Sequence, residues 1–323
     1  MIEMKLICDK NIWNNQLKKT RNFNIFATYE WGEYKKKNWD IQRFSFYKSG
    51  NFLGQCQFLI KKKSKLIFAW NSGGINVSDF KYLEVIILAI NDYFKDFYFN
   101  FRFNFYDITD GQKLFEIARL FTPAQRTINS GFSVLHKFTK TDDLLKNMSS
   151  NHRYYYKKST KNDLSITFES SNKIEEFIKL HNEMTLLKSL SLLTINQKDI
   201  ESLADDFSDN FLIASVYFED QVVASCLILI FEDYAFYYLA ASNEIGRKTF
   251  ASYYMIKELF EYFTTQSITT FDFAGITPYD NSASGVNKFK IGFGGEIVNY
   301  IGEQELSSNK FVKTVFNKMV KYI

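Results

Sequence analysis

Ile41–Ile60 reads IQRFSFYKSGNFLGQCQFLI and Phe211–Ile230 reads FLIASVYFEDQVVASCLILI, two stretches that share one pattern of strand, turn and strand. In the first, apolar segments on either side of Lys48-Ser49-Gly50-Asn51 predict a β-hairpin. In the second, Glu219-Asp220 takes the place of that turn. Each hairpin is expected to open a unit of the same fold.

A third strand, a helix and a further strand follow each hairpin in the same order. The first copy has these at Leu66–Trp70, at about 79–94 and at Phe97–Phe105, and the second has them at Tyr234–Ala240, Ala251–Phe263 and Thr269–Phe273. The copies align without a gap, because Tyr47 and Tyr217, Cys56 and Cys226, and Phe103 and Phe273 are all 170 positions apart (217 minus 47 for the first pair). We infer an internal duplication.

The length of 323 residues also predicts two domains, and 46% hydrophobic residues supply a core for each. We expect an α/β (α+β) protein with mixed sheets flanked by helices. Residues 1–140, joined by a C-terminal helix within 306–323, are expected to form the first unit, and residues 141–305 the second. The apolar stripe of Asn309–Tyr322 predicts that this helix packs back on the first unit.

The remaining composition indicates a compartment but no partner. A net charge of +4 is mild, and the local lysine clusters fit either solvated faces or phosphate contacts. Cys8, Cys56 and Cys226 are isolated, which is typical of a reducing compartment. No apolar run has the length of a signal or a membrane span, so we expect a cytoplasmic protein with at most peripheral contact with the inner face of the membrane.

Three motifs resemble those of a known family. They are Thr28–Lys36 (TYEWGEYKK), His152–Ser159 (HRYYYKKS) and, most specifically, Phe271–Ile276 (FDFAGI) followed by Gly285–Gly295 (GVNKFKIGFGG). The order of elements resembles the GNAT acetyltransferase fold. Two such units with these motifs resemble the FemABX family of aminoacyltransferases, which build peptidoglycan interpeptide bridges.

The resemblance implies an aminoacyl-tRNA donor and an acceptor amine on a nucleotide- or lipid-linked muropeptide or amino-sugar precursor of the cell envelope. Two features depart from the family. Tyrosines replace much of the basic pattern at Tyr154–Tyr156, and 182–206 leaves no room for the coiled-coil arm of some members. Members without the arm are the better analogy.

Acyl transfer to an amine requires stabilisation of an oxyanion but no nucleophilic residue. The three histidines are scattered along the sequence, and no group of residues has the spacing of metal ligands. Lys290 is the candidate for neutralising an oxyanion or a phosphate, and Asp272 for orienting or deprotonating the amine. The candidates for substrate binding are Lys288, Gly292, Gly294 and Gly295 near that lysine, and Lys36, Arg153 and Lys157 as phosphate contacts. Each candidate has a structural alternative. The glycine-rich segment with its lysines could be a tight turn, Asp272 a hydrogen-bonded carboxylate at a strand end, and Lys36, Arg153 and Lys157 exposed charges on helices.

The sequence of Asn243–Lys248 gives evidence on the identity of the acyl donor. GNAT enzymes that use acyl-CoA typically have Q/R-x-x-G-x-G/A there, whereas this chain reads NEIGRK. Acyl-CoA is therefore disfavoured and no cofactor is expected. Two other functions remain open: an acyl-CoA-dependent N-acyltransferase acting on an amino sugar of a surface polysaccharide, and a non-catalytic RNA-binding protein.

Overall fold

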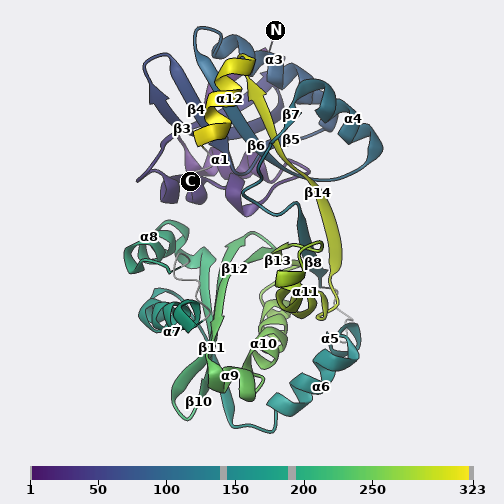
Figure 1. Ribbon diagram of the computed structural model, residues 1–323. Helices are drawn as coiled ribbons and strands as arrows, with labels where there is room; N and C mark the ends of the chain where they lie inside the picture. The colour runs from purple at the N-terminus through teal and green to yellow at the C-terminus, as the bar shows by residue number, and fades with distance from the viewer. Residues whose placement is uncertain (1, 139–143, 188–193, 320–323) are drawn as a thin grey trace. The chain divides into compact units, whose positions relative to one another are not determined.

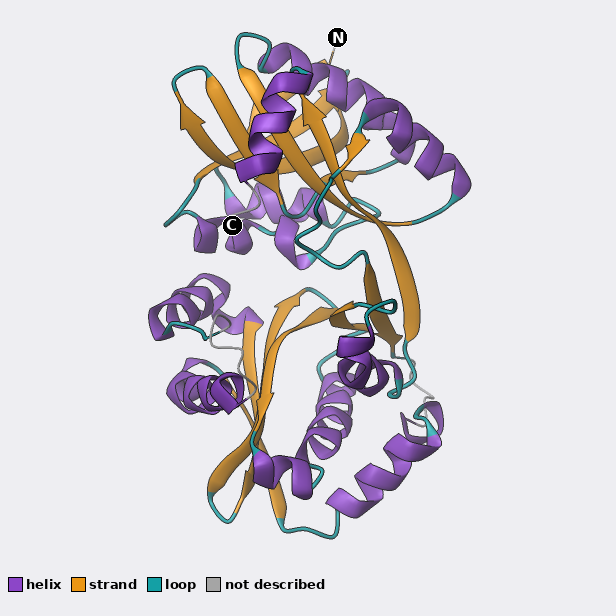
Figure 2. Cartoon of the chain, viewed as in Figure 1, coloured by secondary structure: helices purple, strands orange, loops and turns teal. Residues whose placement is uncertain are grey.

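The computed structural model describes residues 2–138, 144–187 and 194–319. It divides into two compact units, unit 1 with Met1–Gly131 and Asn299–Ile323, and unit 2 with Phe132–Val298. Each unit has one sheet with helices on both of its faces (Figures 1 and 2).

Unit 1 is built on the sheet order β1-β2-β3-β4-β6-β14, with β5 beside β3 and β7 beside β14. Its elements are β1 (Ile2–Leu6), α1 (Lys10–Leu17), α2 (Tyr29–Lys35), β2 (Asp40–Lys48), β3 (Asn51–Lys63), β4 (Leu66–Asn71), β5 (Ile75–Val77), α3 (Leu83–Tyr93), β6 (Tyr98–Ile108), α4 (Gly111–Leu120), β7 (Thr122–Pro123), β14 (Glu296–Ser307) and α12 (Lys310–Met319).

The two faces of this sheet differ in chemistry. Every second residue of β6 from Phe99 to Phe105 is a phenylalanine that faces α3. Phe101 and Phe103 pack there with Phe58 and with Ile90 of the helix. Burying each such ring stabilises the fold by about 1.5–3 kcal/mol. The opposite face is polar and faces α1 and α2, where Arg43 donates to Glu33 at 2.9 Å.

Unit 2 has the sheet order β8-β13-β12-β11-β10-β9. Its elements are β8 (Phe132–Lys137), α5 (Leu144–Asn147), α6 (Ser150–Ser159), β9 (Leu164–Glu169), α7 (Ile174–Leu187), α8 (Gln197–Phe207), β10 (Phe211–Phe218), β11 (Gln221–Phe231), β12 (Tyr234–Ser242), α9 (Glu244–Lys248), α10 (Ala251–Thr265), β13 (Thr270–Ile276) and α11 (Ser284–Ile291). Figure 2 shows α7 and α8 on one side of the strands and α10 on the other. Phe260 and Phe263 of α10 are fully buried against Phe271 of β13.

The duplication is confirmed in detail. β2 and β3 form an antiparallel hairpin with a register shift between Phe46 and Tyr47, and β10 and β11 form one with a shift between Val216 and Tyr217, at the same offset of 170. In each unit the third strand then pairs in parallel with the strand that follows the helix. A bulge placed identically in both copies reflects shared backbone geometry as well as shared apolar pattern.

The unit boundaries lie at 131/132 and 298/299, whereas the sequence placed them at 140/141 and 305/306. The first differs because β8 pairs antiparallel with β13 and so belongs to unit 2. The second differs because Tyr300–Ser307 of β14 pair with β6 of unit 1.

The terminal helix packs on unit 1, as predicted. Val312 is buried and the Phe316 ring stacks on Phe68 with 5.4 Å between ring centroids. Asn317 also bonds to Glu305 of β14 at 3.1 Å. The helix was expected over Asn309–Tyr322, and residues 320–322 of that range lie outside the described residues.

Candidate active site

The two units differ where the third strand meets its parallel neighbour. In unit 1, β4 and β6 pair through six residue pairs, from Leu66–Tyr98 to Asn71–Phe103. In unit 2, β12 and β13 pair only from Tyr234–Thr270 to Phe236–Asp272. Beyond Asp272 the strands no longer pair, and the β13–β8 register shifts between Asp272 and Gly275. Ala274 there has a φ of +60°, a left-handed conformation that costs a non-glycine residue strain. This irregular segment contains Asp272, and the side chain of Lys290 reaches it from α11.

Asp272 is 2% exposed, and its carboxylate is held from three sides. It accepts hydrogen bonds from the hydroxyls of Ser133 and Tyr234, and from the Ala274 amide at 2.7 Å. Burial raises the pKa of Asp272, while these hydrogen bonds and the positive charge of Lys290 oppose that shift. A carboxylate so occupied can hold its charge in place but has little capacity left for a substrate amine.

Lys290 lies in the last turn of α11, and its Nζ donates to the Gly275 carbonyl at 2.8 Å. Burial lowers its pKa to about 8, and the nearby charge of Asp272 opposes the shift. The structure therefore brings both predicted catalytic residues to the same turn of unit 2. Because an ammonium group has three N–H donors, the bond to Gly275 leaves two for a substrate oxygen.

The three glycines after Lys290 pack against protein atoms rather than an open space. A Cβ on Gly292 would lie 2.0 Å from the His152 ring, one on Gly294 2.1 Å from the Asn147 carbonyl oxygen, and one on Gly295 2.6 Å from Val134. Gly294 also has a φ of +89°. Their small size lets the α5–α6 segment and β8 lie close to this turn. The contact of these glycines with a substrate stays a prediction.

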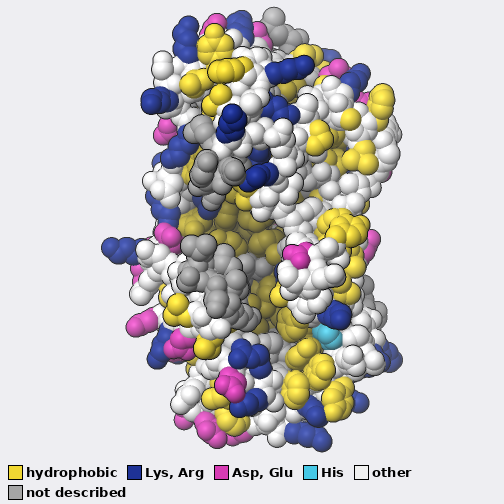
Figure 3. All heavy atoms as spheres, in the orientation of Figure 1, with side chains coloured by type: hydrophobic (Ala, Val, Ile, Leu, Met, Phe, Trp, Pro, Cys, Tyr) yellow, Lys and Arg dark blue, Asp and Glu magenta, His cyan; other side chains and the backbone are white. Residues whose placement is uncertain are grey.

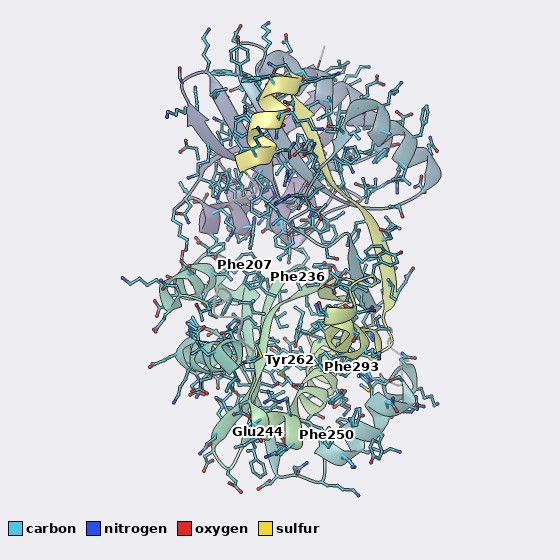
Figure 4. All side chains as sticks on the ribbon, viewed as in Figure 1. Phe207, Phe236, Glu244, Phe250, Tyr262 and Phe293 are labelled. Atoms are coloured by element: carbon cyan, nitrogen blue, oxygen red, sulfur yellow. The ribbon has the colours of Figure 1, made fainter. Side chains whose placement is uncertain are left out.

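The sequence did not single out His152, which joins α6 to the end of α11. Its Nε2 is 2.9 Å from the Phe289 carbonyl oxygen and its Nδ1 is 2.9 Å from the Ser149 hydroxyl. Its ring lies against Phe293, which Figure 4 labels beside α11. Burial lowers the pKa of His152, as expected for a neutral ring that fixes the helix carrying Lys290.

Arg153 and Lys157 line one pocket of about 390 Å³ together with Leu145 and Lys146. The Arg153 guanidinium donates to the carbonyl of Met148, so its position is fixed by the preceding turn. Three of the four lining side chains that the structure describes are cationic, which makes the pocket suited to a phosphate group.

The other two candidate lysines, Lys288 and Lys36, lie in different units. Lys288 is exposed on α11, two residues before Lys290. Lys36 is in unit 1, at the end of α2, and pairs with Glu33 at 3.2 Å.

Asn243–Lys248, the segment that corresponds to the pyrophosphate-binding loop of acyl-CoA enzymes, and the start of α10 after it make contacts within the protein. The Asn243 side chain accepts from the Gly246 amide at 2.8 Å, which caps α9. At the start of α10, the ring of Phe250, which Figure 4 labels, stacks on Tyr155 of α6 with centroids 5.0 Å apart. Asn162 also donates to the Thr249 carbonyl at 3.2 Å. Helix α6 thus covers the end of α10 that a pyrophosphate would approach.

Within the described residues, no cluster of His, Cys, Asp and Glu side chains could hold a metal ion. In that part of the chain, too, no helix combines the length and the apolar character needed to cross a bilayer.

Comparisons with known proteins agree on this architecture. The FemAB family model matches residues 193–321. The structure of FemX superposes with a TM-score of 0.84 at 14% identity, covering 98% of this chain and 100% of that one. L-PGS from Bacillus licheniformis gives 0.57 at 14% identity, covering 97% of both chains. A tandem GNAT protein from the clavulanic acid biosynthesis pathway gives 0.58 at 8%, covering 96% and 99%. Curated protein sequences gave no match.

The chain is thus a tandem GNAT-fold protein with mixed α/β units, as its repeat predicted. Over residues 193–321, which include Asp272 and Lys290, its sequence matches the FemAB family model. The predicted resemblance to that family, and with it the classification as an acyltransferase, is confirmed.

Proposed function

We propose that this protein transfers an aminoacyl group from an aminoacyl-tRNA to an amino group on a nucleotide- or lipid-linked precursor of the cell envelope, forming an amide. The observation that carries the proposal is the FemAB match, because the matched residues contain the Asp272–Lys290 site. The reaction would take place in the cytoplasm, at most in peripheral contact with the membrane, and peptidoglycan precursors are the first acceptors to test.

In the proposed reaction, the neutral acceptor amine attacks the ester carbonyl of the aminoacyl-tRNA. The C–N bond forms, the carbonyl oxygen becomes an oxyanion, and the bond to the ribose oxygen then breaks as the amine proton moves to the leaving hydroxyl. Lys290 in its protonated form stabilises the oxyanion through its two remaining N–H donors. Asp272 keeps Lys290 protonated and in place, since its charge raises the pKa of that lysine.

This role for Asp272 differs from the one expected from sequence. Orienting or deprotonating the amine would require a carboxylate oxygen open to substrate. Asp272 is buried and already accepts three hydrogen bonds. We therefore assign it to the support of Lys290.

The tRNA donor is supported by charge and by packing. Arg153 and Lys157 line a cationic pocket, and α6 carries no acidic side chain along its length. An acyl-CoA donor is disfavoured because Asn243 caps α9 and Tyr155 covers the start of α10.

The test is transfer by the purified protein from total tRNA charged with radiolabelled amino acids to a panel of amino-bearing envelope precursors, beside reactions with labelled acyl-CoA. Label that moves from tRNA to a muropeptide precursor supports the proposal. Transfer from acyl-CoA alone to an amino sugar would replace it with polysaccharide N-acylation. Salt-dependent tRNA binding without any transfer would indicate an RNA-binding protein.

A further inference from the structure

A second basic pocket lies in unit 1, between α12 and the segment after α4. Its volume is about 550 Å³, and the cationic residues among its described lining are Arg126, Lys310, Lys313 and Lys318. Hydroxyl and amide side chains, among them Thr122 and Asn317, complete the lining. Figure 3 shows dark blue Lys and Arg side chains on and beside α12. No residue given a role in the proposed reaction lines this pocket.

The carboxylates behind the pocket are paired with Arg102 and Lys313, so they cancel only part of its positive charge. Glu303 and Glu305 of β14 are 4% and 1% exposed, and Arg102 donates to both, at 3.4 and 2.6 Å. A second oxygen of Glu303 accepts from the amides of Ile128 and Asn129. Among the described residues, five cations including Arg102 stand against these two carboxylates, and no acidic residue lines the pocket.

The inner wall of the pocket is held in place by this network. Asn317 accepts from Arg102 at 3.2 Å and donates to Glu305 at 3.1 Å. Lys313 lies 3.7 Å from Glu305 and also donates to the Thr122 hydroxyl, at 2.5 Å. By contrast, among the described residues no ion pair joins Arg126, Lys310 or Lys318 to an acidic group. These three exposed cations are available to an anion.

The chemistry of the lining fits a phosphodiester. Cations beside hydroxyl and amide donors are the groups that bind phosphate oxygens in RNA complexes. Phe311, which follows Lys310, is 77% exposed and offers a ring on which a base can stack. The volume is that of a small-ligand site, large enough for a nucleotide unit.

An RNA strand fits this surface better than a lipid bilayer does. A helix that lies on a membrane needs a continuous apolar face. In α12 the apolar side chains Val312 and Phe316 face the sheet, where Val312 is 5% exposed and Phe316 stacks on Phe68. Phe311 and Val315 alone remain outside among the described side chains of α12, and they are too few for such a face.

We propose that the pocket formed by Arg126, Lys310, Lys313 and Lys318 binds phosphodiester groups of an RNA, with Phe311 stacking on a base. The inference deepens the proposed function, on which it rests for the identity of that RNA as the donor tRNA. It gives unit 1 a part in donor binding that is separate from the reacting groups of unit 2.

The experiment measures equilibrium binding of uncharged total tRNA to the full chain across a salt series, without any turnover. The test variant carries Arg126→Gln, Lys310→Gln and Lys318→Gln, and keeps Lys313 and Arg102 because they hold the fold. The matched control carries Lys48→Gln, Lys95→Gln and Lys179→Gln, which remove the same charge from exposed positions elsewhere. A third variant, Phe311→Ala, tests the stacking ring. Equal melting temperatures establish that all variants are folded.

We expect the test variant to lose at least about tenfold in tRNA affinity near 0.1 M salt, and its salt slope to fall by about two to three. The control should lose less than about threefold, and Phe311→Ala about fivefold or more. Equal losses in both triple variants, or no loss in the test variant, would overturn the proposal. So would loss of binding to anionic phospholipid vesicles with tRNA affinity unchanged. Since binding is read without transfer, failure of the proposed reaction leaves this result interpretable.

Discussion

The pKa of Lys290 can be measured without knowing the substrate. Burial lowers it to about 8 from the ordinary 10.5. At about pH 8 half of the Lys290 side chains would then be neutral, against about 0.3% of lysines with the ordinary value, a difference of about 150-fold. Only the neutral amine reacts with an acylating reagent. We therefore expect Lys290 to be labelled with a pH midpoint near 8.

The assay is competitive acetylation from about pH 6 to 11, with mass spectrometry of the peptide that contains Lys290 and with a blocked lysine amide in the same tube as reference. The midpoint, rather than the absolute rate, is the readout, because partial burial slows the reagent at every pH. A midpoint for Lys290 equal to that of the free amide would refute the reasoning from burial.

Four further outcomes follow from the site and the fold. Transfer should fall as the pH rises through about 8, because Lys290 loses the proton that stabilises the oxyanion, and Lys290→Arg should remove that limb from the pH profile. Asp272→Asn should move the labelling midpoint of Lys290 lower, since the carboxylate charge raises that pKa, and should slow transfer about a hundredfold; an unchanged midpoint would separate the two residues. Gly294→Ala should cost about 2–4 kcal/mol in chemical denaturation, from its positive φ and the Asn147 carbonyl, whereas Gly285→Ala, with open space around it in α11, should be neutral or stabilising by up to about 1 kcal/mol. Arg102→Met should cost about 3–5 kcal/mol, because it leaves Glu303 buried without its cation and Glu305 with Lys313 at 3.7 Å; a loss below about 1 kcal/mol would show that the carboxylates find another partner.

Much of the fold could be predicted because its signals are local. The alternation of Phe99, Phe101 and Phe103 requires only a strand with one buried face, and the repeat at an offset of 170 extends that inference to a second unit. The limits of the units could not be read in the same way. Whether Phe132–Lys137 pairs within unit 1 or unit 2 depends on strands more than a hundred residues away in sequence.

The site was predictable only in part. Lys290 and Asp272 stand out in the motif, but Ser133 and Tyr234, which hold Asp272, are 139 and 38 residues away from it. The glycines mark a close approach without telling what approaches, and here it is the His152 ring and the Asn147 backbone. The sequence also carries no local signal that the pairing of β12 with β13 ends at Asp272. The strands β4 and β6 have a similar apolar pattern, and they pair along the whole of β4.

The measurement that tests the account most directly is the single-turnover rate of aminoacyl transfer from charged tRNA by the wild-type protein, by Lys290→Met and by the control Lys179→Met, which alters an exposed residue of α7. The account predicts transfer by the wild type and by the control at rates within about twofold of each other. It predicts a loss of at least about a hundredfold for Lys290→Met, with an unchanged melting temperature. Transfer that survives intact in Lys290→Met would contradict the assignment of the reaction to the Asp272–Lys290 site.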